Sequence, residues 1–150
     1  SSLQHVVMRQ TLEGERVERF MTADPITVGP DVPLSRFVNE YVFHYHFAIF
    51  PVTDENGRLV GVINSRAPSN LQQPEWEHAT VRDVMQEASE DILIDADTDA
   101  VEALSRLRQG EGRRLVVVED GHPVGILSLR DLLDFLALKI DLSPRTIAEG

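Results

Sequence analysis

Apolar residues recur at helical spacing in several segments of the chain, and each segment predicts a helix with one buried face. These segments are residues 3–15, 34–42, 101–107 and 129–140. Short apolar and β-branched runs between turn residues predict strands. They are residues 26–28, 49–53, 58–63, 92–94, 115–118 and 123–127. After the first helix, the predicted elements follow the order β-α-β-β-α twice.

Turn and cap residues define the ends of these elements. Asp54–Gly57 and Asp120–Gly121 contain the residues that tight hairpin turns require, so each predicts a β-hairpin. Asp31 is expected to cap the second helix, because its carboxylate can accept from the first free N–H groups. Asp97 or Thr98 is expected to cap the third helix in the same way.

The two halves of the chain repeat one another. Val17–Met21 matches Val81–Met85, and Gly61–Ala67 matches Gly125–Asp131 at the same offset. Repeated units of this size bury their apolar faces by packing on one another. The interface between them is therefore where we expect a ligand.

The first copy departs from the second after its second hairpin strand. Pro68 and Pro74 interrupt its last helix and leave a polar linker. Trp76 lies in that linker, where we expect its ring to fill a gap between the repeats. The predicted organisation is a helix and linker at 1–16, a first repeat at 17–68, a linker at 69–79, a second repeat at 80–140 and a tail at 141–150.

Composition restricts the classes of function. The net charge is −11, and because binding to a phosphate backbone needs a basic surface, no nucleic-acid partner is expected. Without cysteine, the chain has neither disulfides nor thiolate metal ligands. The longest apolar run, residues 41–52, is too short for direct membrane insertion. The sequence begins without an initiator Met, from which we expect a fragment of a longer protein.

The end of the second repeat carries the pattern Gly-hydrophobic-hydrophobic-Ser/Thr-x-x-Asp, filled by Gly125, Ser128 and Asp131. Together with Met85 and the strands between, it resembles the cystathionine-beta-synthase (CBS) domain over about residues 17–139. Two such domains form a Bateman module. The resemblance implies an α/β (α+β) fold in which two β-α-β-β-α repeats pack sheet to sheet with pseudo-two-fold symmetry.

Four further segments are similar to the cytosolic C-terminal region of bacterial intramembrane zinc metalloproteases of the site-two-protease family. They are Leu12–Glu15, Tyr45–Phe47, Pro74–Trp76 and Asp134–Lys139. This similarity implies a cytoplasmic location and a tethered intramembrane protease domain as partner. The catalytic His-Glu-x-x-His of those proteases is absent from this sequence, so we expect a regulatory domain and not an enzyme.

Ser128 and Asp131 stand at the start of the last predicted helix, whose first turn offers unpaired N–H groups and partial positive charge to a phosphate. The Ser128 hydroxyl can donate to a phosphate oxygen, and the Asp131 carboxylate can accept from two ribose hydroxyls. The resemblance assigns the same roles. The alternative is a helix start without a ligand, in which Ser128 caps the helix and the helix dipole stabilises Asp131.

The remaining site residues have two roles. Apolar residues form a slot for adenine, and arginines neutralise the charge of the phosphate. We expect Ile92, Leu93 and Ile126 in the slot and Arg113, Arg114 and Arg130 near the phosphate, beside Gly125. In the first repeat, Asn64 and Ala67 replace the hydroxyl and carboxylate residues, so that site is expected to be degenerate. No cofactor is required, and the ligand classes are AMP, ADP, ATP or S-adenosylmethionine.

Two patterns that imitate metal sites fail on spacing. His44 and His46 would point to different sides of a helix. Asp95–Asp99 imitates the start of a calcium loop, but Ala100 and Arg106 stand where glycine and a bidentate Glu are required. We therefore expect no metal site, and a strand-to-helix turn at the aspartates.

The resulting hypothesis is a ligand-sensing module that binds an adenine nucleotide at the second repeat and controls a tethered partner. The last helix has more apolar positions than one face requires, and the CBS resemblance implies a homodimer that uses it. The alternative is a dimerisation or docking scaffold that binds no ligand.

Overall fold

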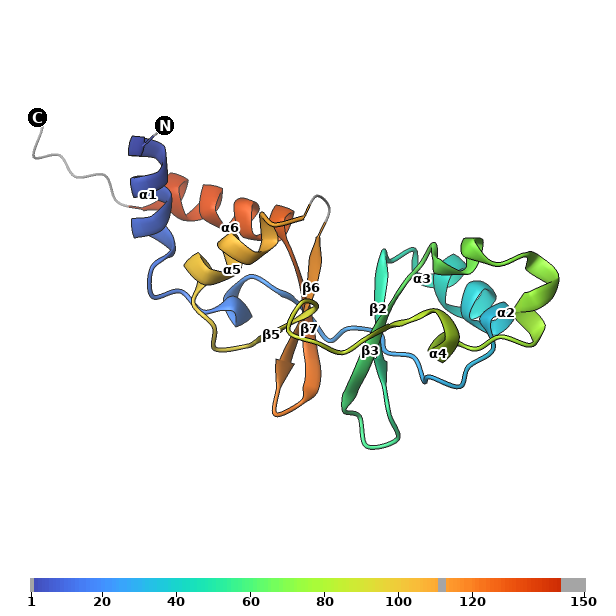
Figure 1. Cartoon of the computed structure of the whole chain (residues 1–150). Helices are drawn as coiled ribbons and strands as arrows, with labels where there is room; N and C mark the ends of the chain where they lie inside the picture. The colour runs from blue at the N-terminus through green and yellow to red at the C-terminus, as the bar shows by residue number, and fades with distance from the viewer. Residues whose placement is uncertain (1, 111–112, 144–150) are drawn as a thin grey trace, which may run out of the picture.

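The computed structural model describes residues 2–110 and 113–143, and its two β-sheets lie beside each other with helices on their outer sides (Figure 1). One sheet has the order β1-β7-β6-β5 and the other β2-β3-β4. The strands are β1 (Thr22–Ala23), β2 (Ile49–Thr53), β3 (Leu59–Asn64), β4 (Gln86–Glu87), β5 (Leu93–Asp95), β6 (Arg114–Glu119) and β7 (His122–Ser128). This mixed α/β architecture confirms the expected fold class.

Helices cover the outer face of each sheet (Figure 1). The α-helices are α1 (Ser2–Leu12), α2 (Leu34–Arg36), α3 (Phe43–Tyr45), α4 (Val81–Val84), α5 (Ala100–Leu107) and α6 (Leu129–Leu142). A π-helical segment, η2 (Phe37–Val42), joins α2 to α3, and short 3-10 turns occur at η1 (Val17–Arg19), η3 (Ala67–Asn70) and η4 (Gln73–Glu77). Within the described part of the chain, no helix has the length and apolar character needed to cross a bilayer.

The second half follows the predicted order β5-α5-β6-β7-α6. β5 pairs with β6 in parallel, and β6 pairs with β7 in antiparallel orientation. Asp120 and Gly121 both have positive φ, 52° and 81°, as a two-residue hairpin with the right-handed strand twist requires. The predicted hairpin is confirmed.

The first hairpin, β2–β3, is also confirmed. Asp54 organises its turn, because one carboxylate oxygen accepts from the N–H of Asn56 at 2.9 Å and of Arg58 at 3.0 Å. Gly57 takes the positive φ of 79°.

Elsewhere the first half is less regular than predicted. The strand expected at 26–28 is reduced to a single parallel bridge between Val28 and Val52. The interrupted last helix becomes η3 and η4. Trp76 packs against the core of the first half and donates from its indole to the Pro68 carbonyl at 2.9 Å. The prediction that Trp76 fills a gap between the repeats was therefore wrong.

Two predicted helix caps were also wrong. Pro33 precedes α2 without a side-chain cap, and Asp31 forms an ion pair with Arg82 at 3.1 Å. Asp99, and neither Asp97 nor Thr98, caps α5 by accepting from the Val101 N–H at 2.8 Å. The aspartates do form the predicted strand-to-helix turn.

Each half completes its sheet with a short strand from the other half. β1 pairs with β7 through Thr22↔Ile126 and Ala23↔Gly125. β4 pairs with β3 through Gly61↔Glu87 and Val62↔Gln86. The chain therefore crosses between the halves at both points, and neither sheet is complete without the other half of the sequence.

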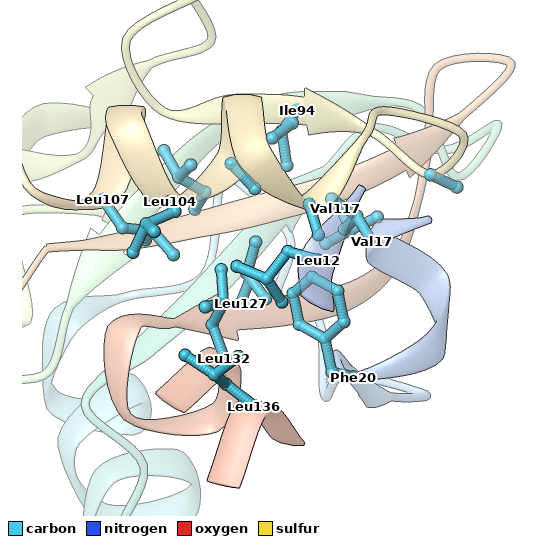
Figure 2. Packing of buried hydrophobic residues seen from close by; sticks show 14 residues of the cluster. Leu12, Val17, Phe20, Ile94, Leu104, Leu107, Val117, Leu127, Leu132 and Leu136 are labelled. Atoms are coloured by element: carbon cyan, nitrogen blue, oxygen red, sulfur yellow. The ribbon is translucent and has the colours of Figure 1, made fainter. Parts of the chain in front are cut away.

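Two hydrophobic cores lie on the outer sides of the sheets. The core of the first half includes Phe37, Phe50 and Ile63. The second core includes Leu107, Leu127 and Leu132 from α5, β7 and α6 (Figure 2). Leu12, Val17 and Phe20 precede the second half by many residues, but their side chains belong to this second core. The N-terminal helix is thus part of the packed structure of the second half.

The two hairpins also touch at their turns. The Leu59 N–H donates to the Gly121 carbonyl at 2.8 Å, and His122 Nδ1 lies 3.0 Å from the Gly57 carbonyl. This contact joins the two halves at the tips of the hairpins.

Candidate functional site

A cavity of about 280 Å³, which we call the Ser128 cavity, lies between the two halves. Its lining from the second half is Arg114, Ile126, Ser128 and Asp131. The first half contributes residues 22–26 together with Phe47, Ala48, Ile49 and Pro51. A molecule in this cavity would contact both repeats.

Ser128 ends β7 and caps α6. Its Oγ accepts from the Asp131 N–H at 3.1 Å, so Ser128 caps α6 as the capping interpretation holds. The hydroxyl proton remains available as a donor, since a capping oxygen uses only an acceptor position. The N-terminus of the 14-residue helix α6 therefore presents the cavity with partial positive charge and hydrogen-bond donors.

Asp131 lies in the first turn of α6 and is half-buried. Its Oδ2 is 3.5 Å from the Thr22 hydroxyl, which donates to it from strand β1. The contact is long, so a ligand hydroxyl can replace it at low cost. Asp131 is thus a carboxylate acceptor directed to the boundary between the halves.

Arg114 begins β6 and is the cross-strand partner of Ser128. Directly paired residues of adjacent strands project to the same side of the sheet, which explains why both side chains line the Ser128 cavity. Arg114 also lines a second, larger cavity described below.

Phe47 is a site residue that the sequence did not indicate. It follows His46, whose left-handed φ of 61° ends α3, and Phe47 is 48% exposed. The ring stacks on Tyr45 with centroids 5.7 Å apart and an interplanar angle of 18°. Tyr45 in turn contacts the buried Phe50. A supported aromatic face therefore borders the cavity that contains Ser128 and Asp131.

The larger cavity, of about 940 Å³, is called here the Arg113 cavity. It also lies between the halves and shares Ile49 and Arg114 with the Ser128 cavity. Its lining includes Ile92 and Arg113 from the second half. The structure thus separates Ile92 and Arg113 from Ser128 and Asp131, with which the sequence had grouped them.

Asn64 and Ala67, the residues of the expected degenerate site, line the Arg113 cavity. The Asn64 amide oxygen accepts from the Arg66 N–H at 2.8 Å, which closes a local turn. Ala67 begins η3, only four residues long, so this position lacks both a ribose acceptor and the N-terminus of a long helix.

Three other expected site residues lie elsewhere. Gly125 is buried in β7, where a Cβ would approach the Thr22 carbonyl oxygen to 3.0 Å. Leu93 is half-buried in β5, and Arg130 is exposed on α6. Because Gly125 has no side chain, strand β1 can lie close against β7 at this position.

Among the described residues, no group of three or more His, Asp or Glu side chains is placed so that it could hold a metal ion. His46 instead stabilises the end of α3, with Nε2 2.8 Å from the Phe43 carbonyl.

The sequence of this chain is similar to one part of several longer known proteins. A zinc metalloprotease of Methanocaldococcus jannaschii is 32% identical over 123 residues, 82% of this chain and 32% of the relative. An inosine-5'-monophosphate dehydrogenase of Bifidobacterium longum is 28% identical over 121 residues, 79% of this chain and 22% of the relative. The chain thus spans about a third or less of the length of these relatives.

Solved structures of similar fold include CBSX2 of Arabidopsis thaliana in complex with AMP, with a TM-score of 0.69 and 27% identity over 85% of this chain and 99% of that one. The CBS domain of the bacterial CNNM/CorC family Mg²⁺ transporter in complex with ATP has a TM-score of 0.73 at 21% identity. It covers 89% of this chain and 97% of that one. The CBS domain model matches residues 17–67 and again 81–138. This chain therefore belongs to the CBS domain family and carries two CBS domains in tandem.

Proposed function

We propose that this CBS pair is a regulatory module that binds an adenine nucleotide in the Ser128 cavity. The observation that carries the proposal is the position of Ser128 and Asp131 at the N-terminus of α6, facing residues of the first repeat across one cavity. The AMP complex of CBSX2 and the ATP complex of the transporter domain support this ligand class.

Each part of a nucleotide has a chemical partner in this proposal. The phosphate lies at the α6 N-terminus, where backbone N–H groups, the Ser128 hydroxyl and Arg114 donate to it. The Asp131 carboxylate accepts from the ribose hydroxyls in place of Thr22. The base occupies the apolar part of the cavity, beside Phe47 and Ile126. S-adenosylmethionine, which has no phosphate, remains the alternative adenosyl ligand.

A binding titration with AMP, ADP, ATP and S-adenosylmethionine tests the proposal. At about 100 times its dissociation constant, a ligand should stabilise the fold by roughly 2.7 kcal/mol, which is several degrees in Tm. Asp131→Ala should abolish that shift while the ligand-free Tm stays close to wild type. Asp134→Ala is the matched control, because this exposed carboxylate lies on α6 outside the cavity lining.

If no ligand shifts the Tm at millimolar concentration, the sensing function is wrong. The scaffold hypothesis would then replace it.

Ligand contact with both repeats provides the regulatory step. A nucleotide bound between them favours the arrangement in which Ser128 and Phe47 contact it together. The nucleotide changes the free-energy difference between the two arrangements by the difference in its binding free energy to them, typically about 1–3 kcal/mol. A partner joined to the CBS pair can respond to that shift.

We further propose that the partner is an intramembrane zinc protease domain in the same protein and that the module lies on its cytoplasmic side. Similarity to the Methanocaldococcus jannaschii zinc metalloprotease supports this partner. In vesicles that contain the whole parent protein, proteolysis should change when the nucleotide is added. Asp131→Ala in that protein should remove the response without removing the basal activity.

A second proposal is that the module forms a homodimer. Exposed apolar side chains on α1 and α6 favour this assembly, since contiguous apolar surface in a soluble protein often marks an interface. They are Leu3, Val6, Val7, Leu133, Leu138, Ile140 and Leu142. Light scattering after gel filtration should give twice the chain mass, and Leu138→Glu should give the monomer. A wild-type monomer would contradict this assembly.

A further inference from the structure

Helices α1 and α5 lie on the outer side of the second half (Figure 1), and a groove runs between them. The groove consists of two adjoining hollows of about 330 and 540 Å³, which share Arg9, Val101 and Ser105 in their linings. We call it the α1–α5 groove. None of its described lining residues lines the Ser128 cavity or the Arg113 cavity. It is therefore separate from the proposed nucleotide site.

The two helices run in opposite directions along the groove. The N–H of Gly14, which follows α1, donates to the carboxylate of Asp99, which precedes α5, at 2.9 Å. The end of α1 therefore lies at the start of α5. At the other end of the groove, His5 of α1 and Arg108 after α5 line the same hollow. Two antiparallel helices with a groove between them offer a seat in which a third helix can pack.

The floor of the groove is apolar. Leu104 is buried, and Met8 and Val101 are half-buried and pack against the second core. Recognition of an amphipathic helix generally uses such a floor, on which the helix lays its apolar face.

The two ends of the groove carry opposite charge. Arg9 and Arg108 line one hollow, which has no carboxylate among its described lining residues. Three carboxylates line the other hollow, where Arg9 is the cation; they belong to Glu13, Asp99 and Glu102. Apart from Asp99, whose carboxylate holds the turn before α5, these charged groups form no ion pair within the described part of the chain. They are therefore available to a partner.

We propose that the α1–α5 groove binds an amphipathic helix of a partner protein. The apolar side chains of that helix lie on the floor, its carboxylates face Arg9 and Arg108, and its lysines or arginines face Glu13 and Glu102. Complementary charges at both ends fix the register of the bound helix. The groove extends over about two helical turns, roughly 12 Å, so the complex is small and transient.

The proposed homodimer leaves this groove open. The exposed apolar residues of α1 assigned to the dimer are Leu3, Val6 and Val7. Residues three or four apart share one face of a helix, so these three lie on a different face from Arg9 and Glu13, which line the groove. A second copy on the apolar face and a partner helix in the groove are compatible.

Fluorescence anisotropy with a labelled synthetic peptide tests this docking site. The peptide has about 15 residues, the length at which an isolated helix begins to be stable, with a leucine stripe, glutamates in its first turn and lysines in its last. The control peptide has the same composition, but its glutamates and lysines alternate along the polar face. The wild-type protein should bind the first peptide about fivefold more tightly, which corresponds to two or three exposed ion pairs.

Variants of the groove locate the binding. Ser105→Trp should abolish it, because Ser105 is exposed in the middle of the groove and the indole would fill that space. Gln10→Trp is the matched control, because Gln10 is exposed on α1 outside the groove lining. Arg108→Glu should weaken binding of the first peptide. A peptide with lysines in place of the glutamates should bind Arg108→Glu more tightly than it binds the wild type.

Binding of neither peptide at millimolar concentration, equal binding of both, or unchanged binding by Ser105→Trp would overturn the docking site. Light scattering of the wild-type and Ser105→Trp proteins tests the other occupant. If Ser105→Trp converts a dimer to a monomer, a second copy occupies the groove and the docking site for a partner helix is wrong. These measurements need no nucleotide, so their failure leaves the proposed function unaffected.

Discussion

Gly61 lies directly beneath Met85, where an added Cβ would be 2.9 Å from the Met85 sulfur and 2.6 Å from the Gln86 carbonyl oxygen. Gly125 and Met21 repeat this relationship in the other sheet. At both places a strand from one half of the chain crosses the sheet of the other half. The close approach of two backbones explains the glycine in each repeat.

Gly61→Ala should therefore destabilise the protein by about 1–3 kcal/mol, the usual cost of forcing extra volume into a packed site. Urea unfolding measures the change. Gly29→Ala is the control, because a Cβ there meets only Val32 Cγ2 at 3.8 Å. We expect it to stay within about 0.5 kcal/mol of wild type. Equal stability of the two variants would contradict the tight crossing of β4 over β3.

Phe47→Ala should weaken nucleotide binding, because removing an aromatic platform costs about 1–3 kcal/mol per stacked base. Calorimetry should therefore show a loss of affinity of about five- to 140-fold, and Phe47→Trp should retain affinity. Phe43→Ala is the matched control, since Phe43 is 64% exposed and lies outside the Ser128 cavity lining. Identical losses in the two alanine variants would show that the base does not stack on Phe47.

Leu12→Ala should destabilise the fold by about 2–5 kcal/mol, the range for truncating a buried leucine. Leu12 is fully buried in the core of the second half. Leu3→Ala, on the same helix but 72% exposed, should have little effect. Chemical denaturation followed by circular dichroism gives both values. A harmless Leu12→Ala would mean that α1 does not contribute to the second core.

The Leu12→Ala protein should also unfold in one step, although the substitution lies in the second core. Trp76, the single tryptophan, packs on the first core and reports its unfolding by fluorescence. Because β1 and β4 exchange between the sheets, loss of one half removes a strand from the other. Fluorescence and circular dichroism should give coincident transitions. Separate midpoints would show that the halves unfold independently.

Much of the candidate site was accessible from local sequence. Ser128 and Asp131 follow a predicted strand and open a predicted helix, so their positions depend only on neighbouring residues. Phe47 carries no such signal. An exposed apolar ring in a connection has no periodicity to mark it, and its role depends on Tyr45 beneath it and on the other repeat across the cavity.

The sequence by itself determined the repeat, both hairpins and the long helices, because turn residues and apolar periodicity act over a few neighbouring positions. Only the tertiary structure decided which aspartate caps α5. Asp99 also accepts from the Gly14 N–H at 2.9 Å, a contact that no local pattern contains. It likewise decided the exchange of β1 and β4 and the division of the expected site into two cavities. These features arise where distant segments meet, so they depend on packing between the halves.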